Sequence, residues 1–443
     1  MTGSRKNGVY LLLLSCGISV IWALALDSGK QGMAMGFPGI YYGTQCLVQH
    51  CDPYNMSELN NFYSSQVQVS DLDSVQRRQS ITLYVNLPPT FLVVAPFALL
   101  PFKIAAVIWA SLTVASFSLA AYLVWTLGRL RASKVALFLA CIFLANAETI
   151  FAGGNTAGIV VSFSVIAVWC FLQNRFVTAG TICLAIALAI KPHDAGFVWL
   201  YFLLAGTVYR RRALQSAAIA LVLAFSAILW VSRAAPHWIQ EFRTNMSFIS
   251  AHGGINDPGP ASIGMRIPGM IIDLQTILSV IWDDPRFYNA ACYFVCGILG
   301  SIWLWKTVKS RFSTESAWLA LASVSALTML VTYHRPYDAK LLLLTVPACA
   351  ILWARGGKVG WIALLLTTTG TVMTGDLPLA ILMILTEKLK LSGAGIGQEV
   401  LALLLTRPLP LILLSISIFY LWVYVRQLAK IEELALAEVR APV

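Results

Sequence analysis

Long uninterrupted apolar stretches constrain the fold of this chain more than any other feature. The clearest of them cover residues 9–26, 104–127 and 410–425. A helix needs about 20 apolar residues to cross the roughly 30 Å hydrocarbon core of a membrane, and runs without polar alternation exclude a transmembrane barrel. With 58% hydrophobic and 12% charged residues over 443 positions, the chain is too apolar for a soluble protein. We therefore predict an all-α polytopic transmembrane helical bundle that forms a single integral membrane domain over residues 1–443.

The positive charges lie in short gaps between the apolar runs. The net charge is +11, and lysine and arginine recur within residues 129–134, 210–212, 306–311, 355–358 and 426–430. The positive-inside rule places such gaps in the cytoplasm. This gives about twelve transmembrane helices, with both termini cytoplasmic. It also explains the basic charge without a nucleic-acid partner.

The gaps without basic clusters are then external, and they contain the histidines and most of the acids. Two external segments are large: a first loop at residues 27–88, long enough to form amphipathic helices, and a second loop at residues 232–270. The positive-inside bias leaves acids outside by default, but it does not act on histidine. The one-sided distribution of the histidines points to chemistry at the external face; they are His50, His193, His237, His252 and His334.

For one segment the sequence does not decide whether the chain crosses the membrane or turns back within it. Residues 86–101, NLPPTFLVVAPFALLP, are short and interrupted by prolines. This favours a broken or re-entrant helix that faces protein or a water-filled cavity. If the segment crosses fully, residues 135–150 must bend back instead.

Two of the nine cysteines lie outside the apolar runs. Cys46 and Cys51 flank the sequence LVQH in the first external loop, where an oxidising compartment permits a disulfide. A four-residue gap also fits a helical turn that does not orient both sulfurs correctly. The sequence allows either arrangement.

Polar clusters from distant parts of the sequence return to the external face, as they do where loops of a helical bundle build a pocket. Lys191 lies outside against the charge bias, which suits a lipid phosphate or a lysine that snorkels to the interface. Arg335 can hold a phosphate through two hydrogen bonds or pair with Asp338. The candidate substrate-binding residues are Tyr41, Tyr42, Lys191, His193, His252, Asn256, Asp257, His334, Arg335 and Asp338.

The order of several short motifs resembles glycosyltransferase family 87, over about residues 9 to 425. The motifs are a YYG…CDPYN loop, PPTFLVVAPFALLP, GGNTAG at the start of a helix, a helix ending in KP, and YHRPYDAKLLLLTVPA. The resemblance implies a GT-C type fold and an inverting, metal-independent enzyme without cofactors. Such an enzyme moves a sugar, usually mannose, from a polyprenyl-phosphate donor to a lipid or glycan acceptor at the external face. In the family, an aspartate of the first external loop is thought to act as base.

This chain departs from the family at that acid. The family pattern Asp-Phe-x-x-x-Tyr-Tyr aligns with residues 36–42, where the first position is Gly36. An alcohol nucleophile needs a base within hydrogen-bond reach, so Asp27 or Asp52 is expected to substitute, and Asp27 is favoured. Asp52 precedes a proline and also fits a simple turn. The glycine at position 36 is thus the feature that argues most strongly against catalytic activity.

Three functions remain open from the sequence. The first is a glycosyltransferase of a bacterial-type inner (plasma) membrane, whose partners are the donor, the acceptor and membrane lipids. The second is a catalytically degenerate protein that binds lipid-linked sugar, and turnover distinguishes it from the first. The third is a lipid or solute transporter, although no clear inverted repeat is visible. No P-loop, dinucleotide fingerprint or zinc-ligand spacing is present, which argues against ATP hydrolysis, redox and metal chemistry.

Overall fold

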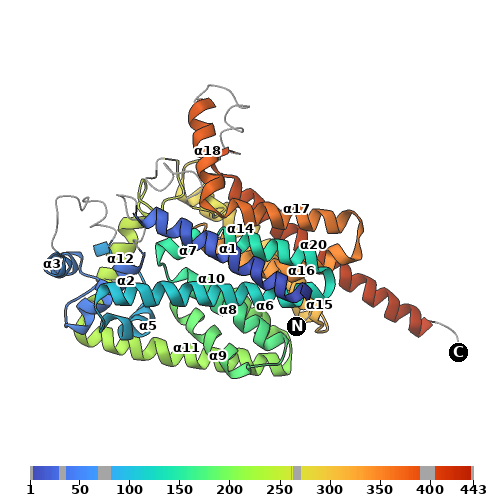
Figure 1. The fold of residues 1–443 in the computed structure, drawn as a ribbon, viewed down its shortest axis with the longest axis horizontal. Helices are drawn as coiled ribbons and strands as arrows, with labels where there is room; N and C mark the ends of the chain where they lie inside the picture. The colour runs from blue at the N-terminus through green and yellow to red at the C-terminus, as the bar shows by residue number, and fades with distance from the viewer. Residues whose placement is uncertain are drawn as a thin grey trace.

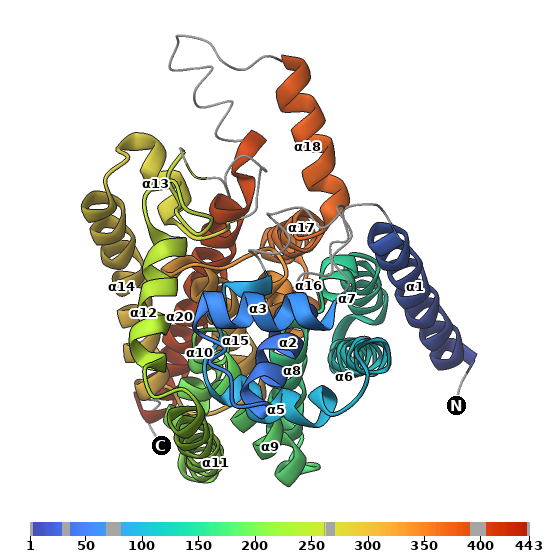
Figure 2. The ribbon, with the colours of Figure 1, turned by 90° about the vertical axis from the view of Figure 1, so that its left-hand side faces the viewer.

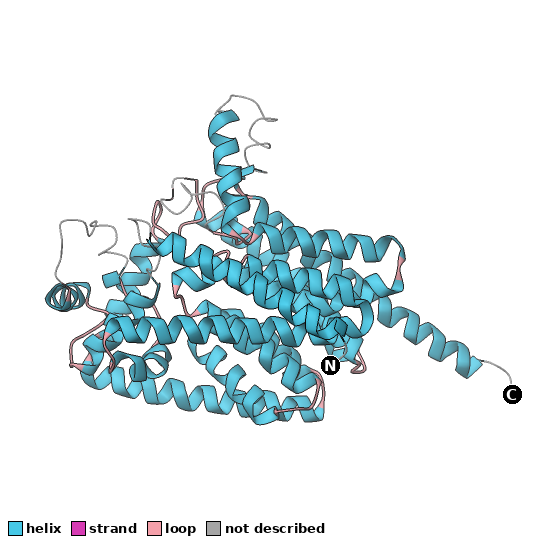
Figure 3. Cartoon of the chain, viewed as in Figure 1, coloured by secondary structure: helices cyan, strands magenta, loops and turns pink. Residues whose placement is uncertain are grey.

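The computed structural model describes residues 3–28, 36–67, 81–260, 262, 271–389 and 405–440. Within these ranges all regular secondary structure is helical and no strand is present (Figure 3). The prediction of an all-α polytopic bundle is confirmed.

The long helices lie side by side along one direction of the molecule (Figure 1). In the described part of the chain, six helical stretches are long and apolar enough to cross a membrane. They belong to α1 (Gly3–Ser28), α6 (Phe102–Ala145) with α7 (Glu148–Gly153), α11 (Thr207–Ala234), α14 (Pro285–Lys309), α15 (Thr314–Val331) and α20 (Pro408–Arg440). The described part of the chain also contains shorter helices between these stretches: α8 (Ala157–Leu172), α9 (Val177–Ile190), α10 (Pro192–Leu204), α16 (Thr345–Arg355) and α17 (Gly357–Met373).

The long helix α6 is a hairpin of two helices. Its dihedral angles leave the helical region at Ala132, and a Cβ added at Gly128 would lie 2.7 Å from the Cβ of Ala136. Eight residues of a straight helix rise about 12 Å, so the chain must reverse direction between these two residues. The absence of a side chain at Gly128 permits the close packing of the two arms.

The proline-punctuated segment forms α5 (Pro89–Ala98), with Pro96 inside the helix. Ten helical residues span about 15 Å, which is half of the hydrocarbon core. The helix is therefore too short to cross. The structure agrees with the first of the two possibilities above, in which residues 86–101 do not span the membrane.

Short helices cover one end of the bundle: α2 (Gly36–Val48), α3 (Met56–Gln66), α5 and α12 (Trp238–Ser250) (Figures 1 and 2). Here α3 is amphipathic, with Leu59 and Tyr63 buried one turn apart. In contrast, ten of the thirteen residues of α2 are buried, because aromatic side chains pack on it from α5 and the start of α6. We call the end of the bundle covered by α2, α3, α5 and α12 the loop end. The remaining described helices are α13 (Gln275–Ile281), the 3₁₀ helix η2 (Asp338–Leu344) and α18 (Asp376–Leu389).

The basic gaps meet at the opposite end of the bundle. Glu315 pairs with Arg131 at 2.9 Å and with Arg355 at 2.6 Å, which joins three gaps that are far apart in sequence. The hydroxyl groups of Ser310 and Tyr424 are hydrogen-bonded at 3.1 Å, which joins the gap at residues 306–311 to α20. The start of α1 and the end of α20 point the same way (Figure 1). The gaps that the charge pattern groups on one face thus do lie together.

Candidate active site

The tip of the α9–α10 hairpin carries three polar residues, of which Asp194 is buried, Lys191 is partly buried and His193 is exposed. The helix α9 ends because Lys191 precedes Pro192, and a residue before proline is pushed out of the helical region; its angles are φ −137° and ψ 80°. Pro192 then starts α10, where a proline is tolerated because the first amide needs no partner. Lys191, His193 and Asp194 therefore sit together at the tip.

The segment Thr332–Asp338 meets this tip from the other side. α15 ends at Val331, and Pro336 prevents its helix from continuing through the segment. The Asp338 carboxylate accepts a hydrogen bond from the amide of Arg335 at 2.9 Å, and the Asp338 amide donates to the Arg335 carbonyl at 2.9 Å. This local turn directs Asp338 toward Lys191 and fixes the backbone of Arg335.

We define the buried charge cluster as Lys191, His193, Asp194, His334, Arg335 and Asp338. The Lys191 ammonium lies 2.6 Å from Asp338 Oδ1 and 3.5 Å from Asp194 Oδ2. The exposed fraction of the side chain is 16% for Lys191 and no more than 2% for either carboxylate. Charged groups this far from solvent persist in proteins only when they are paired.

His334 is held between two acceptors. Its Nδ1 lies 2.6 Å from the Thr332 carbonyl oxygen, and its Nε2 lies 3.0 Å from Asp194 Oδ1. Only an imidazolium can donate from both ring nitrogens. The structure therefore assigns a positive charge to His334, whose side chain is fully buried.

The electrostatics of the cluster separate its two histidines. Burial alone lowers the pKa of His334, but hydrogen bonding to Asp194 and the charges of Asp194 and Asp338 outweigh it and raise that pKa. Partial burial, helped by the charges of Lys191 and His334, lowers the pKa of His193 to about 4, although Asp194 opposes the shift. Burial works against the charge on Asp194, yet Lys191 and His334 hold its pKa below the ordinary range.

His193, Asp194 and His334 are also residue types that can hold a metal ion, since their ligand atoms lie within 4.8 Å of one another. Two features oppose that interpretation. The hydrogen bond from His334 Nε2 to Asp194 uses the position that a metal would occupy, and the Lys191 ammonium lies against the same carboxylate. We therefore treat the group as a hydrogen-bonded ion cluster.

The cluster is flanked by tyrosines and by the start of α8. The Arg335 Nε donates a hydrogen bond to the Tyr333 hydroxyl, and the Lys191 ammonium lies 5.5 Å from the centre of the Tyr337 ring. The Tyr337 hydroxyl accepts from Asn155 Nδ2 at 3.4 Å. Asn155 immediately precedes the N-cap of α8, and its Oδ1 accepts a hydrogen bond from the Ala157 amide at 2.9 Å.

Gly36 packs against this same turn. A Cβ at Gly36 would lie 2.4 Å from the Gly153 carbonyl oxygen and 2.8 Å from the Asn155 amide nitrogen. Gly154, at φ +56°, in turn approaches the Cβ of Phe37. A carboxylate at position 36 would thus sit beside the cluster, but backbone atoms fill the space in which it would begin.

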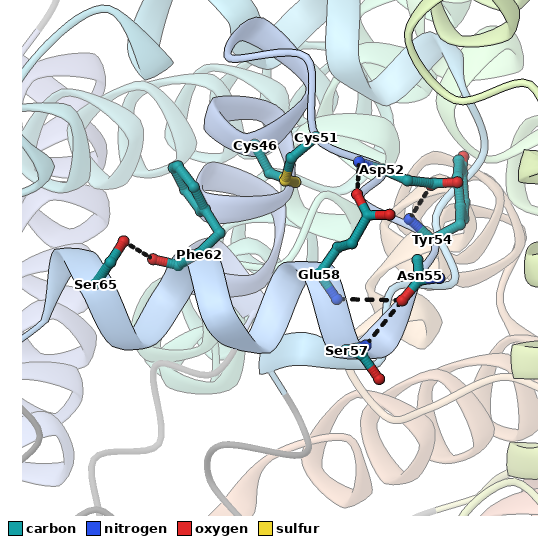
Figure 4. The surroundings of a disulfide bond; sticks show 9 residues. All are labelled: Cys46, Cys51, Asp52, Tyr54, Asn55, Ser57, Glu58, Phe62 and Ser65. Carbon is teal, nitrogen blue, oxygen red and sulfur yellow. Dashed lines mark hydrogen bonds between the residues drawn. A yellow bond between two sulfur atoms is a disulfide. The ribbon is translucent and has the colours of Figure 1, made fainter.

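The two acids expected to substitute lie in different settings. Asp52 Oδ1 accepts the Tyr54 amide at 2.8 Å, and the Asp52 amide donates to Glu58 at 2.8 Å, which is a turn next to the Cys46–Cys51 disulfide (Figure 4). The disulfide that the sequence allows is therefore formed. Burial is the main cause of the raised pKa of Asp52. Asp27 lies in the last turn of α1; its side chain is outside the described part of the structure, as are residues 29–35 and 68–80 of the first loop.

Tyr41 and Tyr42 belong to the aromatic packing of the loop end. The Tyr41 hydroxyl donates to the Leu100 carbonyl at 2.6 Å and accepts from Gln45 at 3.0 Å. The Tyr42 ring stacks on Phe102, with ring centres 5.5 Å apart. Both tyrosines are buried, and their described contacts are to protein groups outside the charge cluster.

The second external loop forms its own network. Asp257 is 1% exposed and accepts from the amides of Gly253 and Gly259 at 2.6 and 3.0 Å. The ring of His252 lies 3.3 Å from the same carboxylate, and the Asn256 amide donates to the Ile249 carbonyl at 2.9 Å. The carboxylate therefore orders the glycine-rich turn; residues 261 and 263–270 of this loop are not described.

A short segment connects that loop to the charge cluster. The amide of Ile272 donates to the His334 carbonyl at 3.0 Å, and Asp273 follows it. Burial raises the pKa of Asp273 to about 7. Asp273 and Asp194 are not among the site residues expected from the sequence. For Asp194 the signal was present, because a lysine and an aspartate three residues apart share one side of a helical turn.

Surface hollows lie elsewhere. One of about 670 Å³ lies along α12 beside His237 and Arg243, and one of about 470 Å³ lies along α11 beside Arg210 and Arg211. Neither contains the acid and base groups described above. Chemistry, rather than surface shape, therefore identifies the charge cluster as the candidate site.

A comparison with known protein families supports the resemblance that the sequence motifs indicate. The model of glycosyltransferase family 87 matches residues 84–332, more than half of the chain. This span includes α5, the Gly153–Asn155 turn and the α9–α10 tip, whereas Gly36 and the Thr332–Asp338 segment beyond Thr332 lie outside it. No curated protein and no solved structure matches the chain. Its helical membrane architecture and the matched span together show that the chain belongs to glycosyltransferase family 87.

Proposed function

We propose that this chain transfers a sugar, most simply mannose, from a polyprenyl-phosphate donor to a lipid or glycan acceptor at the external face of a bacterial-type inner membrane. The transfer inverts the anomeric centre and needs no metal. The observation that carries the proposal is the buried charge cluster, because its charge is complementary to the donor.

The charge balance of the cluster favours a singly charged anion. Lys191, Arg335 and the His334 imidazolium supply three positive charges, and Asp194 and Asp338 supply two negative charges. The donor is a phosphodiester, which carries one negative charge at neutral pH. Binding such a group neutralises the cluster, whereas an inorganic phosphate dianion would overcompensate it.

The identity of the cations also suits phosphate. Arg335 presents a planar fork of donors that matches two phosphate oxygens, and its Tyr333 and Asp338 contacts hold the residue in place. Lys191 supplies a point charge from the opposite hairpin. We assign both residues to the donor phosphate, and we assign His334 to balancing the leaving phosphate as negative charge builds up on it.

The external location is supported by two features at opposite ends of the bundle. The Cys46–Cys51 disulfide lies at the loop end, and disulfides persist in oxidising compartments. The basic gaps lie at the other end, around Glu315, which the positive-inside rule assigns to the cytoplasm. Both termini are then cytoplasmic, and residues 27–88 and 232–270 are external loops.

The remaining sequence candidates have supporting roles in this proposal. Tyr41, Tyr42, His252, Asn256 and Asp257 lie at the loop end, where an acceptor approaching from outside would pass. Asp27, at the mouth of α1, remains the acid that the sequence favours as base, ahead of Asp52.

A second function, binding without turnover, is favoured by one observation. The space at Gly36 is filled by the backbone of Gly153 and Asn155, so the position of the expected acid is closed. A protein that lacks any other base would hold the donor and transfer nothing.

The test uses the full-length protein in lipid nanodiscs with polyprenyl-phosphate mannose. We expect saturable binding of this donor, competition by polyprenyl phosphate, and no competition by free mannose. Release of mannose to an acceptor distinguishes the enzyme from the binding protein. Absence of donor binding by the wild-type protein would refute the proposed function in both forms.

A further inference from the structure

The two histidines of the charge cluster share one carboxylate oxygen but differ in what their other nitrogen contacts. Both Nε2 atoms face Asp194 Oδ1, at 3.0 Å for His334 and 3.5 Å for His193. The second nitrogen of His334 donates to the Thr332 carbonyl. No described residue forms a hydrogen bond with Nδ1 of His193. Both ring nitrogens of His334 are therefore engaged, whereas Nδ1 of His193 is available to accept a proton.

His193 is also the accessible member of the pair. Its side chain is 40% exposed, compared with 0% for His334 and 1% for Asp194. The two rings lie 5.1 Å apart at an angle of 62°, so a group that reaches His193 is also beside the positive charge of His334. An acceptor hydroxyl can approach only the exposed ring.

We propose that His193 is the general base of sugar transfer and takes the role that an acid at position 36 would otherwise fill. This inference rests on the proposed function and adds the residue that activates the acceptor. It makes the chain an enzyme despite Gly36.

The two carboxylates of the cluster both face positive groups. Asp338 uses one oxygen for Lys191 and the other for the Arg335 amide. Asp194 Oδ1 faces both histidines, and its Oδ2 makes no hydrogen bond but lies 3.5 Å from the Lys191 ammonium. A carboxylate held by an ammonium and an imidazolium is a weak base, but it can orient a neutral imidazole through Nε2–H and stabilise the imidazolium that forms. Asp194 is thus a positioning residue for His193.

The proton and the bonds balance in the proposed step. The acceptor oxygen attacks the anomeric carbon of the donor while its proton passes to Nδ1 of His193. The bond between the anomeric carbon and the phosphate oxygen breaks, and its electron pair remains on the polyprenyl phosphate. Lys191, Arg335 and His334 face the extra negative charge. The proton then leaves His193 to water or to the released phosphate.

Two neighbouring histidines in opposite protonation states are a recognised basis for assigning acid and base roles. The groups that face His193 are Asp194 and Lys191 on its own hairpin and His334 on the facing segment. Burial, together with the positive charges of Lys191 and His334, lowers the pKa of His193, so its ring is neutral at physiological pH and able to accept a proton.

The first experiment compares His193→Gln and His193→Ala with the wild-type protein in nanodiscs. Polyprenyl-phosphate mannose is the donor, and octyl mannoside, a total membrane lipid extract and water are the acceptors. We expect both variants to lose a factor of about 10² to 10⁴ in transfer rate, while the donor dissociation constant changes less than about threefold. His237→Gln, an exposed histidine at the start of α12, is the matched control and keeps wild-type transfer.

The second measurement excludes a merely structural role. Added imidazole should restore transfer to His193→Ala, because the 40% exposed position leaves an accessible space for it, and should not accelerate the wild type. With the His193 pKa at about 4, wild-type transfer should stay level down to about pH 5 and then fall. A base with an ordinary histidine pKa of about 6.5 would lose activity earlier.

The outcomes separate this inference from the proposed function. If His193→Gln retains wild-type transfer, or if Asp27→Asn alone abolishes it while donor binding persists, His193 is not the base. If the wild type binds donor but transfers to none of the three acceptors, the inference is overturned and binding without turnover stands. If chelation with EDTA abolishes transfer and zinc restores it, the three residues form a metal site instead. Failure of donor binding overturns the proposed function itself.

Discussion

The first external loop and the buried charge cluster satisfy their polar groups in different ways. In the loop, Asp52 bonds to an amide two residues away, and a disulfide joins cysteines five residues apart. In the cluster, Lys191 pairs with Asp338 across 147 residues, and Asp194 bonds to His334 across 140. Short-range partners are what turns require, and they imply nothing about ligands. Charges brought together from distant helices are costly to bury, so their retention points to function.

Lys191→Met should produce the largest loss of stability. The substitution leaves Asp338 buried without its main partner, and breaking a buried ion pair in this way costs about 3–5 kcal/mol. Thermal unfolding in detergent measures the effect. The double variant Lys191→Met with Asp338→Leu removes both charges and should recover much of the loss. A single variant as stable as the wild type would show that the pair is not a structural unit.

Arg335→Ala should weaken donor binding by the charge cluster rather than lower the stability of the protein. Loss of a charge-assisted hydrogen bond costs about 1.5–3 kcal/mol, which weakens donor binding about 10- to 150-fold. Titration with polyprenyl-phosphate mannose gives the dissociation constant. Arg243→Ala, on the exposed face of α12, is the control and should bind normally. Equal weakening in both variants would mean that the effect is a general surface attraction.

Gly36→Ala tests the close contact between the two regions. The new Cβ meets backbone atoms of Gly153 and Asn155, which cannot turn aside as a side chain can, so we expect a loss of about 1–3 kcal/mol. Gly17→Ala in α1 has no atom within 4 Å of its Cβ and should be neutral or slightly stabilising. Gly36→Asp meets the same backbone and should not raise transfer. A gain of transfer in Gly36→Asp would show that the chain has lost its base.

Asp52 should give the smallest effects. Asp52→Ala removes the bond to the Tyr54 amide and should cost about 1 kcal/mol. Asp52→Asn keeps an acceptor oxygen and should change neither the unfolding temperature nor the transfer rate. If Asp52→Asn folds normally and loses transfer, the loop rather than the cluster supplies the base.

The sequence predicts the architecture well because long apolar runs and gaps of positive charge are local features. The pairing of Arg131, Glu315 and Arg355 follows from the positive-inside pattern, since it places their gaps on one face. The convergence of the KPHD and YHRPYD segments follows from the same topology. The hairpin within α6 agrees with the charge pattern as well, since the reversal at Ala132 falls in the basic gap at residues 129–134 between two apolar runs.

The details of the site are harder to predict because they depend on three-dimensional neighbours. The sequence leaves open whether Arg335 binds a phosphate or pairs with Asp338; in the structure the Asp338 carboxylate accepts hydrogen bonds from the Arg335 amide and the Lys191 ammonium. Nothing in the sequence distinguishes His193 from His334, which differ in the second contact of the ring. The closed space at Gly36 depends on a turn more than 100 residues later in the chain.

The most direct test of the account is an experimental structure of the full-length protein with polyprenyl-phosphate mannose bound in a nanodisc. We predict that the phosphate lies within hydrogen-bond distance of Arg335 and Lys191, with the anomeric carbon turned toward the exposed ring of His193. A phosphate bound instead among Tyr41, Tyr42 and Asp52, or in the hollow beside Arg243, would contradict the assignment of the buried charge cluster as the donor site.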